Sequence, residues 1–366
     1  MTKQTVAQSP PRIAIIIHSL NVGGAELVAR NLALALQGQG FQIMILPLRP
    51  APNNQAFTCL HSSSVHIGQS YAQPIRNFSH LRQLRNWTLR QLNDFGADVI
   101  HSHGELADMV NALLPRKDFI RIRTTHNERF LGNKIPWQWL SVFIENILTR
   151  AGRFDHVICI SKKIEQQIHY QRKSIIYNAL TTYTTNRLKK QSKRKPDVRI
   201  IGRISAQKAQ YAFIDHCRKS FDSLRNLPFN LTLIGKEDDT SLSRKIEQES
   251  CGHVRFKGLC SNQIDMYREA DWVIIPSQYE GLSSVMVEAV CNGIPVISMP
   301  VSGAEDVLSL NGLGYFVTNY DEMIEVILGT KPWTIPIEKR IALSEQFSIE
   351  KASLSHAQLY DSFFCK

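Results

Sequence analysis

The stretch Arg12-Ile-Ala-Ile-Ile-Ile-His18 decides the fold class. It is short, β-branched and continuously apolar, which is typical of a parallel strand covered by helices on both faces. A turn over 19–24 and a periodic helix over 25–37 follow it, and the helix stops near two glycines. Further strands are expected at 41–47, 98–101 and 156–160. Strands that alternate with helices predict a doubly wound parallel α/β domain.

This pattern breaks at the polar, basic run Asn186-Arg-Leu-Lys-Lys-Gln-Ser-Lys-Arg-Lys-Pro196, which reads as a linker, and then restarts. Strands are expected at 198–202, 229–234, 254–256, 271–276 and 295–298. Helices are expected at 211–224, 239–250, 262–270, 283–292, 319–328 and 348–364. We therefore predict four parts: a first α/β domain (1–185), a linker (186–197), a second α/β domain (198–347) and a C-terminal helix (348–366).

Composition excludes some classes of protein. The chain has 366 residues, of which 43% are hydrophobic and 20% charged, so it can bury two cores and is not disordered. Its net charge of +11 is uneven: residues 1–180 carry +10, 181–197 carry +5 and 198–366 carry −4. A protein that binds nucleic acid through its overall charge alone does not need its charge to be divided between segments in this way. The nucleic-acid-binding alternative also lacks a recognisable motif.

The compartment is predicted from segments that the sequence does not contain. The first eleven residues include no apolar signal region, and the purest apolar runs are too short to cross a bilayer. The seven cysteines are scattered, without a CxxC pair or a histidine cluster at ligand spacing. We expect a soluble cytoplasmic protein with reduced cysteines and no metal site.

The most informative motif is Pro276-Ser-Gln-Tyr-Glu280-Gly-Leu-Ser-Ser-Val-Met-Val-Glu288-Ala-Val-Cys-Asn-Gly293. A buried strand ends at its proline, and a helix begins near Ser283 or Ser284, either of which can cap it. Ligands bind beyond the carboxyl ends of such strands, and a helix start attracts anions. The two glutamates, about 10–12 Å apart along the helix, can grip hydroxyls at both ends of a phosphate-centred ligand. The alternative is that Glu288 is an ordinary surface residue.

Three weaker motifs accompany it. Gly202 and Arg203 end a strand, and Lys208 follows five residues later, so two cations can hold a diphosphate without a metal. Gly23 and Gly24, after the first strand, allow a close approach of backbone to ligand. A polar cluster, Arg123-Thr-Thr-His126-Asn127, closes the set. Solvated loop charges and a structural histidine are the alternative interpretations.

Together these motifs resemble those of retaining glycosyltransferases of family GT4, which have the two-domain GT-B fold. The family's order is kept: first-loop glycines, Thr124-Thr125-His126, Ile176-Tyr-Asn178, Gly-Arg…Lys and Glu-x7-Glu. The resemblance implies two Rossmann-like domains facing a cleft, with the C-terminal helix packing back towards the first. It implies a hexosyl transfer from a nucleotide sugar, favouring UDP, to a glycan or lipid-linked acceptor in bacterial surface polysaccharide (lipopolysaccharide, O-antigen or capsule) synthesis, without a cofactor or metal.

The resemblance also implies residue roles. Arg203 and Lys208 would stabilise the leaving diphosphate, Glu280 would contact the donor sugar, and Glu288 the ribose. His126 would contact the transferred sugar. The donor-binding set is completed by Gly23, Gly24, Gly202, Gly281, Leu282, Ser283 and Ser284, with the loop Ser302-Gly303-Ala304-Glu305 nearby.

Two positions depart from the family pattern: Ala209 follows the loop lysine where glycine is usual, and Ala179 follows Asn178 where the family has Asn-Gly. The first departure could shift the loop, and the second puts the role of that turn in doubt. Within the same fold, a sugar-nucleotide epimerase is an alternative function.

The first domain also contains a basic amphipathic segment, 74–90, in which four arginines interleave with Phe78, Leu81, Leu84 and Trp87. A second aromatic segment lies at 135–143. Either the aromatics face the core, or the segments attach the protein peripherally to anionic lipid at the inner face of the plasma membrane. The resemblance supports the second interpretation, because many relatives act on lipid-linked acceptors.

Overall fold

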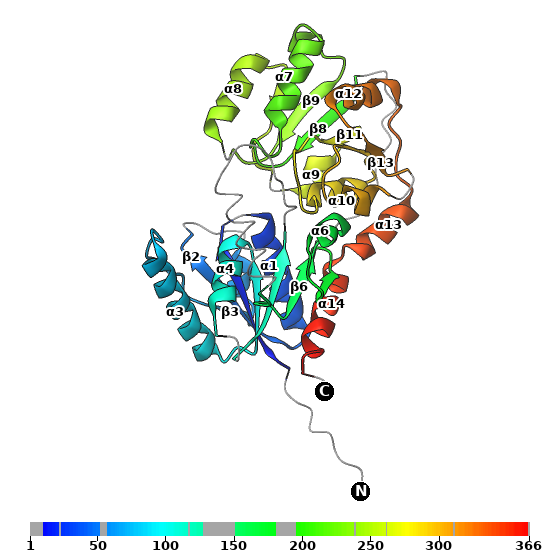
Figure 1. Ribbon diagram of the computed structural model, residues 1–366. Helices are drawn as coiled ribbons and strands as arrows, with labels where there is room; N and C mark the ends of the chain where they lie inside the picture. Colours follow the sequence, from blue (N-terminus) through cyan, green and yellow to red (C-terminus); the bar gives the residue numbers. More distant parts are fainter. Residues whose placement is uncertain are drawn as a thin grey trace. The chain divides into compact units, whose positions relative to one another are not determined.

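The computed structural model describes residues 10–21, 23–51, 57–115, 118–126, 151–180, 195–237, 239–260, 262–309 and 312–364. The chain forms two compact units, the first made of residues 1–180 with 348–366 and the second of residues 181–347 (Figure 1). Most of the predicted linker and the aromatic segment 135–143 lie outside the described residues. No helix within the described ranges is long and apolar enough to span a membrane.

Unit 1 is a doubly wound α/β structure. In the part that is described, its sheet has the strand order β3-β2-β1-β4-β5-β6-β7, and every pairing is parallel. The strands are β1 (Arg12–Ser19), β2 (Gln42–Arg49), β3 (His66–Ile67), β4 (Val99–His103), β5 (Ile120–Thr125), β6 (His156–Cys159) and β7 (Lys173–Ile175). The helices are α1 (Gly24–Gly38), α2 (Thr58–His61), α3 (Phe78–Phe95), α4 (Glu105–Leu113), α6 (Lys162–Gln167) and α14 (Ile349–Asp361).

The continuous apolar run of β1 is explained by two cores. Ile13, Ile15 and Ile17 pack in one cluster with residues of α1, α2 and α14. Ala14 and Ile16 pack in a second cluster with residues of α3 and α4. Successive side chains of a strand point to opposite faces, so a strand covered on both sides must be apolar throughout.

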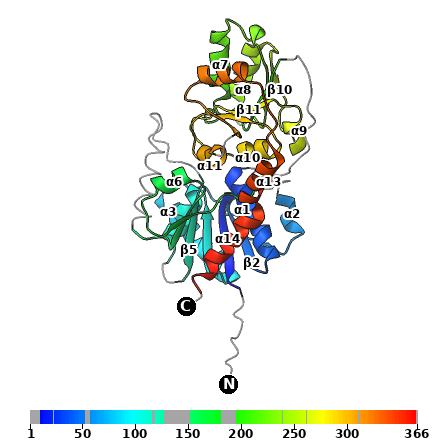
Figure 2. The same ribbon diagram turned by 90° about the vertical axis from the view of Figure 1, so that its right-hand side faces the viewer.

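The C-terminal helix α14 belongs to unit 1, as predicted. It packs against α1 (Figure 2). Its Ala357 and Tyr360 are part of the core that contains Ile13 and Leu36. Ser348 caps the helix by accepting a hydrogen bond from the Lys351 amide. The chain therefore returns to its first unit after the second is complete.

The packing of helix α3 shows which apolar side chains of the basic segment 74–90 face the core. Leu84 is buried, and Leu81 and Trp87 pack against the core, so these side chains do not face a membrane. Asn77 caps the helix by accepting from the His80 amide, so the helix begins four residues later than the predicted segment. Phe78, by contrast, is 77% exposed.

Unit 2 repeats the α/β plan with the described strand order β10-β9-β8-β11-β12-β13, all parallel. Its strands are β8 (Asp197–Ile201), β9 (Asn230–Ile234), β10 (Val254–Phe256), β11 (Trp272–Ile275), β12 (Val296–Ser298) and β13 (Gly314–Phe316). Its helices are α7 (Gln210–Ser220), η2 (Leu224–Asn226), α8 (Thr240–Ser250), α9 (Gln263–Tyr267), α10 (Ser284–Cys291), α11 (Ala304–Leu308), α12 (Tyr320–Gly329) and α13 (Ile337–Gln346).

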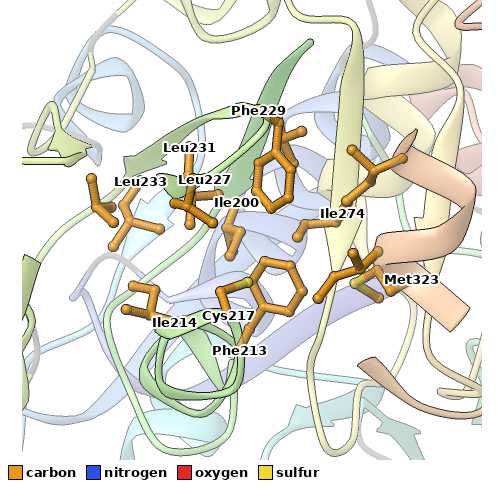
Figure 3. Packing of buried hydrophobic residues seen from close by; sticks show 14 of the residues in the cluster. Ile200, Phe213, Ile214, Cys217, Leu227, Phe229, Leu231, Leu233, Ile274 and Met323 are labelled. Atoms are coloured by element: carbon orange, nitrogen blue, oxygen red, sulfur yellow. The ribbon is translucent and has the colours of Figure 1, made fainter. Parts of the chain in front are cut away.

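One core of unit 2 lies between its sheet and α7 and α12. Phe213 and Cys217 of α7 meet Ile200 and Ile274 of the strands, with Met323 of α12 beside them (Figure 3). The helix α10 packs elsewhere, against β11, β12 and α13. The predicted helix over 211–224 ends at Ser220, and a short 3-10 turn follows it.

Candidate active site

The candidate site of unit 2 lies at the carboxyl edge of its sheet. The strands β8 and β11 are parallel neighbours, so the loops that follow them leave the same edge. The first loop, 202–209, leads into α7, and the second, 276–283, leads into α10. Two of the predicted motifs therefore meet, although 72 residues separate Lys208 from Glu280.

Three contacts fasten the two loops together. The Gln278 amide donates to the Gln207 carbonyl (2.9 Å), and the Gln207 side chain donates to the Tyr279 carbonyl (3.1 Å). The Lys208 ammonium lies 2.7 Å from Glu280 Oε1. Ser277 Oγ donates to the same carboxylate oxygen, also at 2.7 Å. The Glu280 side chain is thus held by two donors and is only 7% exposed.

Gly202 occupies the point where the first loop leaves β8. Its φ is +146°, and Lys208 packs across it, with the lysine Cε 3.4 Å from where a Cβ would lie. Gly235, at the end of the neighbouring β9, has φ +156°, and a Cβ there would lie 2.0 Å from the Gly202 carbonyl oxygen. Both positions need glycine, the first for its conformation and the second for space as well.

The two departures from the family pattern differ in their backbone conformation. Ala209 has φ 54° and ψ 25° and stands at the N-cap of α7, so the loop keeps the left-handed turn that glycine would favour. Ala179 is not among the described residues with positive φ. It is buried, and its carbonyl accepts a long hydrogen bond (3.4 Å) from Asn31 of α1. Of these two alanines, Ala209 has a strained backbone and Ala179 does not.

The start of α10 is packed against another glycine-bearing loop. Gly303 has φ +76°, and a Cβ there would lie 2.8 Å from the Gly281 carbonyl oxygen and 2.9 Å from the Leu282 Cα. Ser283 is the N-cap residue, but its side chain makes no capping bond, so the predicted cap is wrong for this residue. Its hydroxyl is buried and has no hydrogen-bond partner within the described ranges. Gly293, with φ +79°, ends the helix as predicted.

Glu288 lies in the middle of α10 with its side chain partly buried. The Tyr267 hydroxyl of α9 donates to its Oε2 at 2.7 Å. Glu288 is therefore not an ordinary surface glutamate.

In unit 1, the first-loop glycines form the start of α1. Gly23 is the N-cap residue, with extended backbone, and Gly24 is the first helical residue. A Cβ on Gly24 would meet nothing within 4 Å. The first amides of a helix have no partner inside the helix, so this end can receive an anion.

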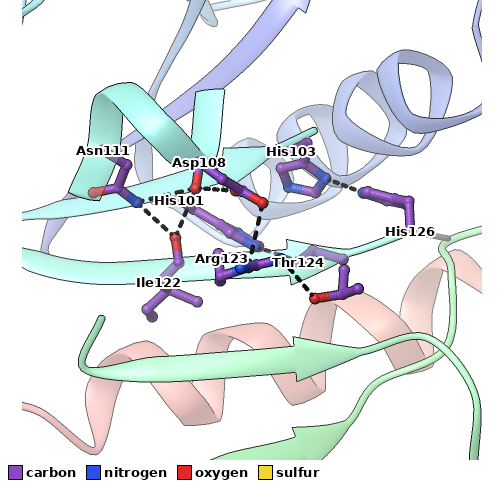
Figure 4. Close-up of polar contacts among 10 residues, drawn as sticks. His101, His103, Asp108, Asn111, Ile122, Arg123, Thr124 and His126 are labelled. Carbon is purple, nitrogen blue, oxygen red and sulfur yellow. Dashed lines mark hydrogen bonds and ion pairs between the residues drawn. The ribbon is translucent and has the colours of Figure 1, made fainter. Parts of the chain in front are cut away.

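His126 follows the end of β5 and contacts a histidine that the sequence reasoning did not select. Its Nε2 lies 2.8 Å from Nδ1 of His103, the last residue of β4 (Figure 4). His101, two residues earlier, stands 2.7 Å from both Thr124 Oγ1 and the Tyr360 hydroxyl of α14. His356 of α14 completes the group, with its ring centroid 5.5 Å from that of His101.

These four histidines, His101, His103, His126 and His356, are called the histidine cluster below. Burial lowers the pKa of each member below its ordinary value, and neighbouring positive charge lowers it further for the first three. The pKa values of His126 and His356 fall to about 4. Neutral imidazoles at pH 7 offer both a donor and an acceptor to hydroxyl groups.

A buried network of polar side chains connects β5 to β4 and α4. Arg123 pairs with Asp108 of α4 at 3.2 Å, and Ser102 donates to the same carboxylate (Figure 4). Asn111 donates to the Ile122 carbonyl. A small cavity of about 10 Å³ lies beside the cluster, lined by residues that include His103, Thr124, Asn178 and His356. Within the described ranges, no group of three or more His, Cys, Asp or Glu side chains could hold a metal ion.

The structure thus brings Lys208 to Glu280 within unit 2, and His126 to His103 within unit 1. Arg203 lies in the first loop of unit 2 with its side chain exposed. Sequence reasoning missed Ser277, Tyr267 and His103. Ser277, two residues beyond β11, and His103, the last residue of β4, lie at the strand ends where ligands commonly bind, and this was a usable signal. Nothing local marks Tyr267.

Two family models match the chain: Glycosyltransferase Family 4 over residues 22–218 and Glycosyl transferases group 1 over residues 184–328. An uncharacterised 41.2 kDa protein in the cps region of Klebsiella pneumoniae is 25% identical, and the match covers 82% of this chain and 90% of that protein. The Escherichia coli O-antigen biosynthesis glycosyltransferase WclY is 20% identical, covering 96% and 99%.

A solved structure of Anabaena HepE in complex with UDP and glucose superposes with a TM-score of 0.75 at 19% identity, covering 96% of this chain and all of that one. The two parallel-sheet units and this likeness give the chain the GT-B fold. Since the first family model spans more than half of the sequence, the chain belongs to glycosyltransferase family 4.

Proposed function

We propose that this glycosyltransferase transfers a hexose from a UDP-sugar, with retention of anomeric configuration, to a glycan or lipid-linked acceptor in bacterial surface polysaccharide synthesis. The names of the two relatives, one in O-antigen synthesis and one in a cps region, support the pathway class. The HepE complex with UDP and glucose supports the donor.

One observation carries the proposal: the contact between Lys208 and Glu280 at the carboxyl edge of the unit 2 sheet. The lysine supplies a point charge suited to a phosphate, and the carboxylate supplies acceptors suited to sugar hydroxyls. Their contact places a phosphate-binding group next to a sugar-binding group, which is the arrangement that a nucleotide sugar requires.

The remaining proposed roles in unit 2 are those that the family resemblance implies. Arg203 joins Lys208 at the diphosphate, beside the backbone of Gly202. The start of α10, with Gly281, Leu282, Ser283 and Ser284, offers amides and the unpartnered Ser283 hydroxyl to the same anion. Glu288 accepts from the ribose hydroxyls.

Unit 1 contributes two elements to the proposal. The backbone at Gly23 and Gly24 receives phosphate oxygens at the start of α1. His126, uncharged at neutral pH and steadied by His103, hydrogen-bonds the transferred sugar.

In the transfer step, the bond between the anomeric carbon and the diphosphate oxygen breaks, and the acceptor oxygen bonds to that carbon on the same face. The acceptor proton passes to the departing diphosphate. No enzymic nucleophile is needed, and stabilisation of the leaving group by Arg203 and Lys208 is the largest expected contribution. Because these cations supply the positive charge, we propose that turnover is insensitive to EDTA.

Thermal-shift screening against UDP- and GDP-sugars tests the donor, because a ligand that binds only the folded state raises the melting temperature. A rise with UDP-sugars and none with GDP-sugars is expected. Donor consumption should then require an acceptor extract. Consumption of donor and release of UDP by the enzyme alone would favour the epimerase alternative.

A second proposal, peripheral attachment to anionic membranes, rests on Phe78. This side chain is 77% exposed at the start of α3, close to the exposed Arg76 and Arg82. Apolar and basic groups side by side suit an anionic lipid surface.

Co-sedimentation with vesicles containing anionic lipid at low salt tests this attachment. Phe78→Ser should reduce binding several-fold at unchanged melting temperature. Leu354→Ser is the matched control, because Leu354 is 55% exposed on α14. Equal binding by wild type and Phe78→Ser, or equal losses in both variants, would contradict the attachment.

A further inference from the structure

The carboxylate of Glu288 is held by a tyrosine from a different helix. Tyr267 is the last residue of α9 and is 3% exposed, and its hydroxyl lies 2.7 Å from Glu288 Oε2. Burial, reinforced by the Glu288 charge, raises the pKa of Tyr267 well above its ordinary value. The hydroxyl therefore stays protonated and donates to the carboxylate.

The backbone around Tyr267 is held by Arg199, a residue of strand β8. Arg199 of β8 donates from Nη1 to the carbonyls of Met266 (2.7 Å) and Asp265 (3.2 Å), and from Nη2 to the carbonyl of Arg268. Its Nε pairs with Asp197 at 2.9 Å. A buried guanidinium thus caps the end of α9, the turn that carries the tyrosine.

We infer that Tyr267 is a positioning residue that presents the Glu288 carboxylate to the ribose of the donor and so sets the preference for a ribonucleotide. This inference rests on the proposed role of Glu288. It adds a residue, absent from all four motifs of the sequence, that acts on the substrate through another side chain.

The physical reason is conformational. A helical glutamate has several rotamers, and fixing such a side chain in one of them costs side-chain entropy. A short charge-assisted bond to a buried tyrosine, which has few rotamers of its own, selects one rotamer before the ligand arrives. Since Tyr267 contacts Oε2, Oε1 and the remaining lone pair of Oε2 are left for ribose hydroxyls.

The experiment compares Tyr267→Phe, Glu288→Gln and the double variant with the wild type by calorimetric titration. UDP and GDP are first titrated into the wild type. The one that binds more tightly is the ribonucleotide probe, and its 2′,3′-dideoxy form is the second probe. Tyr211→Phe is the matched control, because its hydroxyl contacts the Glu249 carboxylate at 3.0 Å elsewhere in unit 2.

We expect Tyr267→Phe to raise the Kd for the ribonucleotide about tenfold, in line with loss of a bond to a charged group. Its Kd for the dideoxy nucleotide should stay within twofold of wild type. The double variant should bind no more weakly than Glu288→Gln alone, and Tyr211→Phe should match wild type for both probes.

An unchanged Kd in Tyr267→Phe, or equal losses for both probes, would overturn the inference while leaving the proposed function intact. Full ribonucleotide affinity in Glu288→Gln would overturn the ribose role of Glu288 and the inference with it. Binding of neither UDP nor GDP by the wild type would overturn the proposed function itself. The ratio of the two Kd values does not depend on the folded fraction, so partial misfolding of a variant does not obscure the outcome.

Discussion

Gly24 separates the demands of folding from those of ligand binding. A Cβ at this position would meet nothing within 4 Å, and the residue begins α1. Gly24→Ala should therefore leave stability unchanged or raise it by up to about 1 kcal/mol, since alanine is the better helix former. If phosphate oxygens approach this backbone, kcat/KM should fall at least tenfold.

Initial-rate kinetics and thermal denaturation check this prediction together. Gly38→Ala, at the other end of α1, is the matched control, because a Cβ there also meets nothing within 4 Å. Wild-type kcat/KM in Gly24→Ala would show that no ligand approaches this backbone.

Ala209 has a strained backbone conformation, which the sequence indicates only through the absence of the usual glycine. The missing glycine indicated that the loop could shift, yet the structure keeps a left-handed residue at φ 54°. That left-handed conformation costs an L-residue such as alanine about 1–2 kcal/mol, a cost that glycine avoids. Ala209→Gly should raise the free energy of unfolding by about 1 kcal/mol and leave turnover within twofold of wild type. Chemical denaturation measures the difference, and a lower midpoint would contradict the strain.

At the scale of elements, the histidine cluster joins the ends of β4 and β5 to α14. His126 and His356 have folded pKa values of about 4, against 6.5 in an unfolded chain. Between these values the unfolded chain binds protons that the folded chain does not. Their contribution to stability is therefore present above pH 6.5 and is lost as the pH falls towards 4, at up to about 1.4 kcal/mol per pH unit for each group.

Hydrogen exchange read by mass spectrometry can follow this loss in each unit separately. Between pH 7 and 5, after correction for intrinsic rates, protection should fall in α14, β4 and β5 more than in β8 and β9. His356→Leu should make the decline shallower, because one titrating group is gone. Equal protection of α14 at both pH values would rule out this linkage.

Several of the long elements were predictable from sequence because their signals are local. The run over 12–18 and the motif over 276–293 each contain a strand or helix with its own boundaries, and the structure places β1, α10 and α14 within a few residues of the prediction. The strands β3, β5, β7 and β13 and the helices α4 and α13 were missed. β3, β7 and β13 have only two or three residues and carry no periodicity. In β5, the buried Arg121 and Arg123 interrupt the apolar pattern.

The candidate site was predictable in part. Lys208 and Glu280 were selected separately, and their contact follows from the adjacency of β8 and β11. Tyr267 could not be found, because its partner lies 21 residues away on another helix. The aromatic side of α3 shows an ambiguity that the sequence leaves open: its spacing fits both a core-facing and a membrane-facing helix, and in the structure Trp87 packs against the core.

At the scale of the whole chain, the two units divide the charge. Residues 1–180 carry +10, and residues 348–366 add two lysines and two acidic residues, so unit 1 has a net charge of +10. Unit 2, residues 181–347, holds 21 basic and 20 acidic side chains and is nearly neutral. A diphosphate site in unit 2 therefore depends on a few placed cations and not on a general positive field.

The release of nucleoside diphosphate by Lys208→Ala, measured against wild type and Lys219→Ala, tests the central proposal most directly. Lys219 is the control because its side chain is 67% exposed on α7 and pairs with Asp215. Removing one preorganised group that stabilises the leaving charge typically costs about 10²–10³ in kcat. We expect a loss of that size in Lys208→Ala with the fold retained by circular dichroism and a lower melting temperature, because Glu280 loses its buried partner; Lys219→Ala should stay within twofold of wild type. Near-normal kcat in Lys208→Ala would contradict the assignment of this site as the centre of glycosyl transfer.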